Sequence, residues 1–156
     1  MHILNTQIIQ KHTNEGDAYS AADIPSTFTQ PWLDFLKLNI GEGKYTVYTK
    51  NQQNRDDNTY HMTLVDPLDS KIIGSKINPF LGYPVHLKAL GIGHIQEEDN
   101  EVYFLICECL ETGKIRDYLN LPTQYFHITL GFKISDIFDK PKDKETLIFP
   151  YSVGDI

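Results

Sequence analysis

Two short segments of the chain, residues 60–64 and 126–130, repeat the same order of residue types. Each consists of an aromatic residue, His, an aliphatic residue, Thr and Leu, so the chain contains two H-x-T motifs. The motifs are His61 with Thr63, and His127 with Thr129. Successive side chains of an extended strand point to opposite faces, so the His and Thr of each motif should share one face and the other three residues should face a core. Two imidazoles and two hydroxyls presented in this way have the composition of a phosphate site with an acid and a base.

The functional interpretation depends on the repetition of the motif. A single H-x-T sequence is a weak match, and it also occurs on the polar face of an ordinary strand. Two copies with matching residues at three further positions, and with the alternation of half-buried strands, favour a functional pair over that alternative. Outside these ten residues the two halves of the chain do not visibly align, so an internal duplication is a hypothesis that rests on the motifs alone.

Cleavage of a phosphodiester is the chemistry that suits this set of side chains. In-line displacement at phosphorus needs a base on the attacking side and an acid on the leaving side. Two histidines with ordinary pKa values near 6.5 can hold opposite protonation states at neutral pH. One of His61 and His127 would take a proton from water, and the other would donate a proton to the departing ribose oxygen. Thr63 and Thr129 would donate hydrogen bonds to the non-bridging oxygens. The sequence does not decide which histidine is the base.

Other residues are candidates for contacts with the substrate. A nucleobase would stack on an aromatic platform, although core packing is the alternative for every candidate. The aromatic candidates are Trp32, Tyr48, Tyr83 and Phe132. Lys133 and Arg116 could contact phosphate or could be solvated surface charges. Gly131, expected on the same face as Thr129, would leave room for a substrate or would mark an irregular strand. His86 and His94 lack a Thr two residues later and are expected to be structural or surface residues.

Composition restricts the class of partner. The chain has 156 residues, 40% of them hydrophobic and 12% aromatic, as expected for a folded domain with a substantial core. Its formal net charge of −7 argues against a broad grip on long duplex nucleic acid, which needs many Lys and Arg contacts, but allows a small nucleotide or an RNA end. We expect a monomer without a membrane span or secretory signal, and therefore a cytoplasmic location. Cys107 and Cys109 should be buried free thiols in a reducing compartment, because no set of residues with zinc-site spacing accompanies them.

The secondary-structure pattern places both motifs on strands within one domain spanning 1–156. A helix is expected at 31–38 and another at 112–119. Strands are expected at 44–50, 85–93 and 101–109, the last two joined as a hairpin by the acidic turn 96–100. Residues 51–58 are strongly polar and should form an exposed loop. The first thirty residues and the tail 135–156 have no clear pattern. This order suggests two related lobes whose histidines meet across a groove.

The paired motifs resemble those of the 2H phosphoesterase superfamily, which includes 2′-5′ RNA ligase-like proteins and cyclic nucleotide phosphodiesterases. The segment 126–132, with the following Asp136-Ile137 and Lys142-Asp143, resembles most the 2H domain of "Swiss army knife" RNA repair proteins. The resemblance implies a bilobal α+β fold, with two antiparallel sheets facing a central groove and flanking helices. It also implies metal-independent chemistry with no cofactor, in which His61 and His127 are catalytic and Thr63 and Thr129 bind the phosphate.

Three functions compete on these observations. The first is a hydrolase that cleaves a 2′,3′-cyclic phosphate, a 2′-5′ linkage or a cyclic dinucleotide. The second is a nucleotide- or RNA-end-binding module of the same fold that lacks turnover, although binding alone would not require both imidazoles. The third is a metalloprotein that uses the histidines as ligands, which sensitivity to a chelator would reveal.

Overall fold

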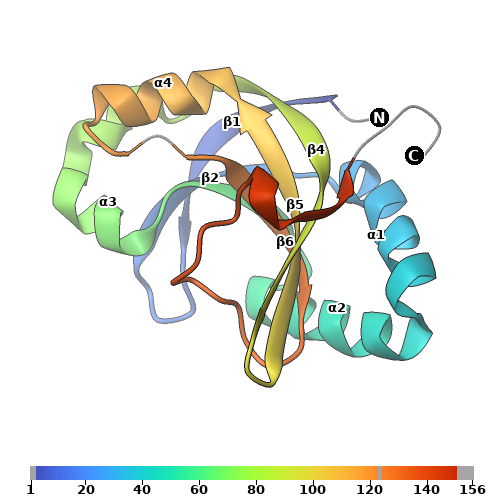
Figure 1. Ribbon diagram of the computed structural model, residues 1–156. Coiled ribbons are helices and arrows are strands. Elements are labelled where there is room, and N and C mark those ends of the chain that lie inside the picture. Colours follow the sequence, from blue (N-terminus) through green and yellow to red (C-terminus); the bar gives the residue numbers. More distant parts are fainter. Residues whose placement is uncertain (1–2, 123, 151–156) are drawn as a thin grey trace.

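The computed structural model describes residues 3–122 and 124–150. Within these ranges the chain forms an α+β fold (Figure 1). The strands are β1 (Ile3–His12), β2 (Ala18–Ile24), β3 (Tyr60–Val65), β4 (Pro84–Glu97), β5 (Asn100–Cys109), β6 (Phe126–Phe132) and β7 (Leu147–Pro150). The helices are α1 (Ser26–Ile40), α2 (Glu42–Asp56), α3 (Pro67–Ile73) and α4 (Leu110–Tyr118), with the 3-10 helices η1 (Gly74–Phe80) and η2 (Lys144–Thr146). In Figure 1, α1 and α2 lie to the right and bottom of the strands, and α3 and α4 to the left and top.

All strand pairs are antiparallel, and the strands follow the order β1-β2-β3-β6-β5-β4-β7. In addition, the start of β1 pairs with the start of β4, where Leu4 lies opposite Leu87. Because β1 pairs with both β2 and β4, the first six strands close into a ring. The predicted α+β class with antiparallel strands is confirmed, and hydrogen bonds join the expected two sheets into one continuous sheet.

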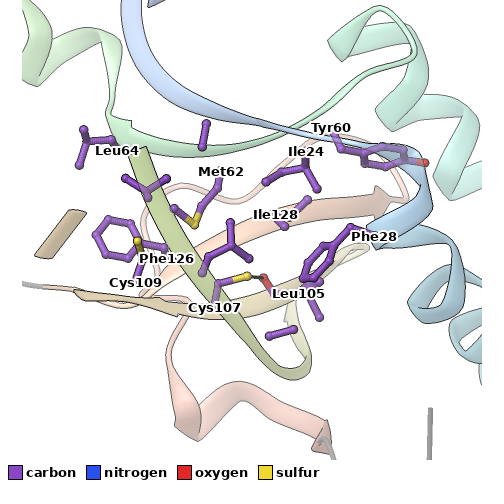
Figure 2. Packing of buried hydrophobic residues seen from close by; sticks show 14 of the residues in the cluster. Ile24, Phe28, Tyr60, Met62, Leu64, Leu105, Cys107, Cys109, Phe126 and Ile128 are labelled. Carbon is purple, nitrogen blue, oxygen red and sulfur yellow. Dashed lines mark hydrogen bonds between the residues drawn. The ribbon is translucent and has the colours of Figure 1, made fainter. Parts of the chain in front are cut away.

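The inside of this ring is the main hydrophobic core. Every strand of the ring contributes to it, and Met62 of β3 and Ile128 of β6 lie side by side there with no exposed surface (Figure 2). The aromatic, aliphatic and Leu residues of both H-x-T segments belong to the same core, as their alternation predicts. Cys107 and Cys109 are buried free thiols on the same face of β5, which is also as expected.

The prediction for residues 44–58 is wrong, because this segment forms most of helix α2. The alternating Tyr, Thr and Val residues of 44–50 have strand propensity, but such a preference is weak and yields to tertiary packing. Here Tyr48, Thr49 and Gln52 are buried at helical spacing against the rest of the molecule. The predicted helix at 31–38 is confirmed and begins five residues earlier, at Ser26.

The other elements follow the sequence pattern more closely. The hairpin of β4 and β5 and the helix α4 are confirmed. Among the first thirty residues, which have no clear pattern, residues 3–24 form the hairpin of β1 and β2, whose turn uses Gly16 with φ of 92°. In the described ranges, no helix combines the length and apolar character needed to cross a membrane.

Candidate active site

The two H-x-T motifs lie on neighbouring antiparallel strands. Met62 of β3 is paired with Ile128 of β6, and continuing this register by one residue places His61 opposite Thr129 and Thr63 opposite His127. Met62 and Ile128 point into the core, so the four motif side chains occupy the other face of the sheet. Directly opposed residues of an antiparallel pair have Cβ atoms about 4.5–5.5 Å apart. The arrangement is therefore a compact group in which each histidine faces the threonine of the other motif.

His61 is half-buried beside the N-terminal hairpin. Its ring centroid lies 5.6 Å from that of Tyr19 on β2. Burial lowers the pKa of His61, and the carboxylate of Asp56 opposes this effect while the Arg55 guanidinium adds to it. The Nδ1 atom is buried and has no hydrogen-bond partner among the described residues. His61 is accordingly a neutral imidazole in the free protein at neutral pH.

His127 is also half-buried, and the ring of Phe104 packs edge-on against it with centroids 5.9 Å apart. Burial lowers the pKa of His127, the Lys142 ammonium lowers it further, and Asp136 opposes them. His61 and Arg55 also act on this pKa, so both lie near His127. Two neutral imidazoles thus share one small site. An anionic phosphate bound there would raise both pKa values and allow one imidazole to become protonated.

Thr129 belongs to a buried polar cluster that the sequence analysis did not anticipate. Its hydroxyl donates to Oδ2 of Asp136 at 3.1 Å. The Asp136 side chain is only 3% exposed, and it also accepts from Nη1 of Arg55 at 2.6 Å and lies 3.3 Å from Nζ of Lys142. These two cations hold the pKa of Asp136 below its usual value despite burial. Thr63 is half-exposed, and its hydroxyl makes no hydrogen bond within the part of the chain that the structure describes.

Arg55 joins this cluster from the last turn of α2. Its Nε and Nη2 atoms donate to the two carboxylate oxygens of Asp56 at 2.8 and 2.7 Å, and its guanidinium lies 5.3 Å from the ring centre of Phe132. Arg55 was not among the predicted site residues, because residues 51–58 were expected to form a loop. Asp136 and Lys142 also had no predicted role in the site, because the segment that follows β6 lacks a regular pattern. Only their part in the family resemblance indicated their importance.

A β-bulge in β6 decides which way Gly131 and Phe132 point. Thr129 lies opposite Phe104 and Gly131 lies opposite Tyr103, so Leu130 is an extra residue in the ladder. The prediction that Gly131 shares a face with Thr129 is therefore wrong. Gly131 faces α2, where an added Cβ would come within 2.9 Å of the Tyr48 carbonyl carbon. Phe132 returns to the face of the histidines.

None of the four predicted aromatic platforms presents an open ring beside the histidines. Trp32 and Tyr48 are buried in the core, and the Tyr48 hydroxyl donates to Glu101 at 2.6 Å. Phe132 is buried on the histidine face beneath Arg55. Tyr83 is 47% exposed and lines a cavity with Phe80 and Tyr118 that contains neither histidine. Tyr19, in the unassigned N-terminal region, is the aromatic residue that contacts His61.

The other charged candidates have structural partners. Arg116 is buried and donates to the carbonyl oxygens of Leu64 and Pro122. Lys133 forms an ion pair with Asp99 at the tip of the β4–β5 hairpin. His86 pairs with Glu111, and His94 pairs with Glu101, as expected for structural and surface residues.

Neither described cavity coincides with the motifs. The one closer to the site has a volume of about 270 Å³, lies between β1, β2, α3 and η1, and includes Tyr19 but neither histidine. In residues 3–122 and 124–150, no three or more His, Cys, Asp or Glu side chains are grouped so that they could hold a metal ion.

One family model matches most of the chain. The model of the Swiss Army Knife 2H phosphoesterase domain matches residues 28–138, a range that includes both H-x-T motifs, Arg55 and Asp136. Searches of curated proteins and of solved structures found no match to the chain. On the strength of the family match over most of its length, the chain belongs to the Swiss Army Knife 2H phosphoesterase family.

Proposed function

We propose that the protein hydrolyses a phosphodiester bond in a small nucleotide or an RNA end, without a metal ion, by acid–base catalysis through His61 and His127. Family membership supports phosphodiesterase-type activity in general. The observation that carries the finer proposal is the register of β3 and β6, which brings two His/Thr pairs together on one face of the sheet.

The surroundings of the two histidines suggest a division of roles. The base must be neutral before reaction, and His127 lies near Lys142 and Arg55, whose charges disfavour its protonation. The acid must be protonated when substrate is bound. Near His61 the carboxylates of Asp56 and Asp23 favour an imidazolium, and they offset the opposing charges of Arg55 and Lys11. We therefore assign His127 as the base that activates water and His61 as the acid that protonates the departing ribose oxygen.

The proposed substrates are 2′,3′-cyclic phosphates, 2′-5′ linked nucleotides and cyclic dinucleotides. All of them present a phosphodiester next to a ribose, and all are small enough for a protein with a net charge of −7 to bind without an extended basic surface. Tyr19, whose ring contacts His61, is the proposed contact for the base or ribose next to the reacting phosphate. We propose that the protein acts as a monomer and does not bind long duplex nucleic acid.

The test is hydrolysis of a panel that contains these compounds and ADP-ribose 1″,2″-cyclic phosphate. His61→Ala and His127→Ala should each lower turnover at least about a hundredfold, the usual contribution of a general acid or base. His86→Ala is the matched control, because this exposed histidine pairs with Glu111 outside the site. Retained turnover in either catalytic variant would contradict the two-histidine mechanism.

Two further measurements separate the alternatives. Binding of the panel compounds without turnover would support the nucleotide-binding module. Loss of activity after exhaustive chelation, restored by one added metal, would support the metalloprotein.

A further inference from the structure

We propose that Arg55 is a substrate-binding residue that holds a non-bridging oxygen of the phosphodiester, and that Asp136 is the residue that positions it. This inference rests on the proposed phosphodiesterase function and adds a residue outside the H-x-T motifs to the site.

Arg55 is held in place more firmly than a surface arginine. Asp56 binds its Nε and Nη2 atoms in a two-pronged contact, and Asp136 binds Nη1 from the opposite element, the segment that follows β6. The ring of Phe132 lies against the guanidinium. An arginine fixed by two carboxylates and an aromatic ring loses little conformational freedom when it binds an anion.

The location of Arg55 places it at the phosphate position. Its Nη1 atom and the Thr129 hydroxyl bind the same oxygen of Asp136, at 2.6 and 3.1 Å, so the guanidinium and Thr129 are near neighbours. Thr129 in turn lies opposite His61 in the register of β3 and β6. The charge of Arg55 also lowers the pKa of both His61 and His127, which places it within reach of both imidazoles.

Two N–H donors of Arg55 remain available for a bound phosphate. A guanidinium carries five N–H donors, and the structure assigns three of them to Asp56 and Asp136. The remaining two belong to Nη1 and Nη2, and the side chain is 29% exposed. The four charged side chains of this cluster have a formal net charge of zero: they are Arg55, Lys142, Asp56 and Asp136. Attraction of a phosphate by Arg55 therefore depends on directed N–H groups and not on an excess of positive charge.

The hydrogen bond made by Thr129 explains why the site needs another donor to the phosphate. A threonine hydroxyl has one proton, and that of Thr129 is directed to Asp136. Thr129 therefore cannot donate to the phosphate while this bond holds. The hydroxyl of Thr63 donates to the phosphate on the side of the first motif. On the side of the second motif, Arg55 donates to the phosphate in place of Thr129.

The experiment compares Arg55→Gln, Arg55→Lys and Asp136→Asn with Lys133→Gln. The control removes the same charge from an exposed lysine that directly follows β6 and pairs with Asp99 at the tip of the β4–β5 hairpin. One readout is kcat and KM on whichever panel compound the wild type hydrolyses fastest. The second is binding of inorganic phosphate, followed by the NMR signals of His61 and His127, which does not require turnover.

We expect Arg55→Gln to lower kcat/KM about a hundredfold, as for loss of one transition-state donor. Phosphate affinity should fall at least about tenfold, and phosphate should no longer raise the pKa of the two histidines. Arg55→Lys should fail to restore either property, because a lysine cannot reproduce the two-pronged geometry. Asp136→Asn should weaken both in the same direction, and Lys133→Gln should match the wild type.

The outcomes separate this inference from the proposed function. If Arg55→Gln and Arg55→Lys keep wild-type kcat/KM and phosphate affinity while His127→Ala is inactive, the role of Arg55 is overturned and the phosphodiesterase stands. If the wild type hydrolyses no panel compound but its phosphate affinity depends on Arg55, the binding role is supported and the proposed function fails. If Arg55→Gln does not fold, Arg55→Lys decides the question: wild-type phosphate affinity in that variant overturns the inference.

Discussion

At the residue scale, the chemistry of this site depends on which polar groups already have partners. The hydroxyl of Thr129 is bonded to a buried carboxylate, whereas that of Thr63 is half-exposed and unbonded within the described residues. His61 and His127 both have lowered pKa values, although different charges surround them. Two motifs with the same residues are therefore expected to respond differently to the same substitution.

Replacing each threonine by valine tests this difference, because valine keeps the shape and removes the hydroxyl. Thr63→Val should lower kcat/KM about tenfold or more and leave stability unchanged, since in the proposed mechanism its hydroxyl binds only the substrate. Thr129→Val should lower the free energy of unfolding by about 1–3 kcal/mol, because the buried Asp136 loses a donor. Urea unfolding and steady-state kinetics on both variants provide the measurement. Equal losses of stability would show that the two hydroxyls are equivalent.

The pH dependence of the rate tests the assignment of His127 as the base. kcat/KM should fall as the pH decreases through the pKa of His127 in the free protein, which lies below 6.5. Asp136 raises this pKa, so Asp136→Asn should lower it and move the acidic limb of the profile to lower pH. A profile measured from pH 2.5 to 9 on both proteins would detect the change. An acidic limb that moves to higher pH would contradict the assignment.

At the element scale, the contact between α2 and β6 positions Arg55. The bulge at Leu130 turns Gly131 toward the helix, and the absence of a side chain lets the Tyr48 backbone approach closely. Arg55 lies two turns further along α2, and its ion pair with Asp136 joins the end of the helix to the segment after β6. Helix α2, whose sequence predicted a strand and a loop, thus determines where the guanidinium lies.

Gly131→Ala should push α2 away from β6. The new Cβ would meet the backbone of Tyr48 at 2.9 Å, and backbone cannot move aside as a flexible side chain can. We expect a loss of about 1–3 kcal/mol in the free energy of unfolding, with a fall in activity that exceeds the unfolded fraction, because Arg55 is displaced. Gly43→Ala in the same helix is the control, since its Cβ meets nothing within 4 Å and should stabilise by up to about 1 kcal/mol. Similar stability changes in the two variants would contradict close packing at Gly131.

At the scale of the whole molecule, the closed ring of strands buries one face of each strand and leaves the polar site on the outside. That outer face holds two histidines with lowered pKa values and a nearly buried Asp136. Groups whose pKa differs between the folded and unfolded states make the stability of the entire fold depend on pH.

Stability should decrease as the pH falls from 7.5 to 5. Below the unfolded histidine pKa of about 6.5, the unfolded chain binds protons that His61 and His127 in the folded protein do not, so acid favours unfolding. The lowered pKa of Asp136 adds stability above its unfolded pKa of about 3.9, and this part is lost only as the pH falls through its folded value. Urea unfolding at the two pH values measures the decrease, and His127→Gln should reduce it. If His127→Gln loses as much unfolding free energy between pH 7.5 and 5 as the wild type does, other groups are responsible.

Much of the architecture follows from local patterns. The alternation in both H-x-T segments predicted strands and the residues that face the core, because each of these strands presents one face to it. The hairpin of β4 and β5 was also predicted correctly, although β5 contains a continuous apolar run from Val102 to Cys107 that is buried on both faces. Helix α2 was not predicted because its buried positions are few, only Tyr48, Thr49 and Gln52, and most of its other residues are polar. The hairpin of β1 and β2 has mixed exposure and lacked a pattern for a similar reason.

By itself the sequence determined two His/Thr pairs on strands, backed by apolar residues, and a family resemblance that the family match confirms. Residue type and the two-residue repeat of a strand suffice for that, because both are local properties. Only the tertiary structure decided that His61 faces Thr129, that a bulge turns Gly131 away, and that Asp136 gathers Arg55, Lys142 and Thr129. Strand register, bulges and ion pairs between distant segments depend on how the whole chain packs, and no local window of the sequence contains that information.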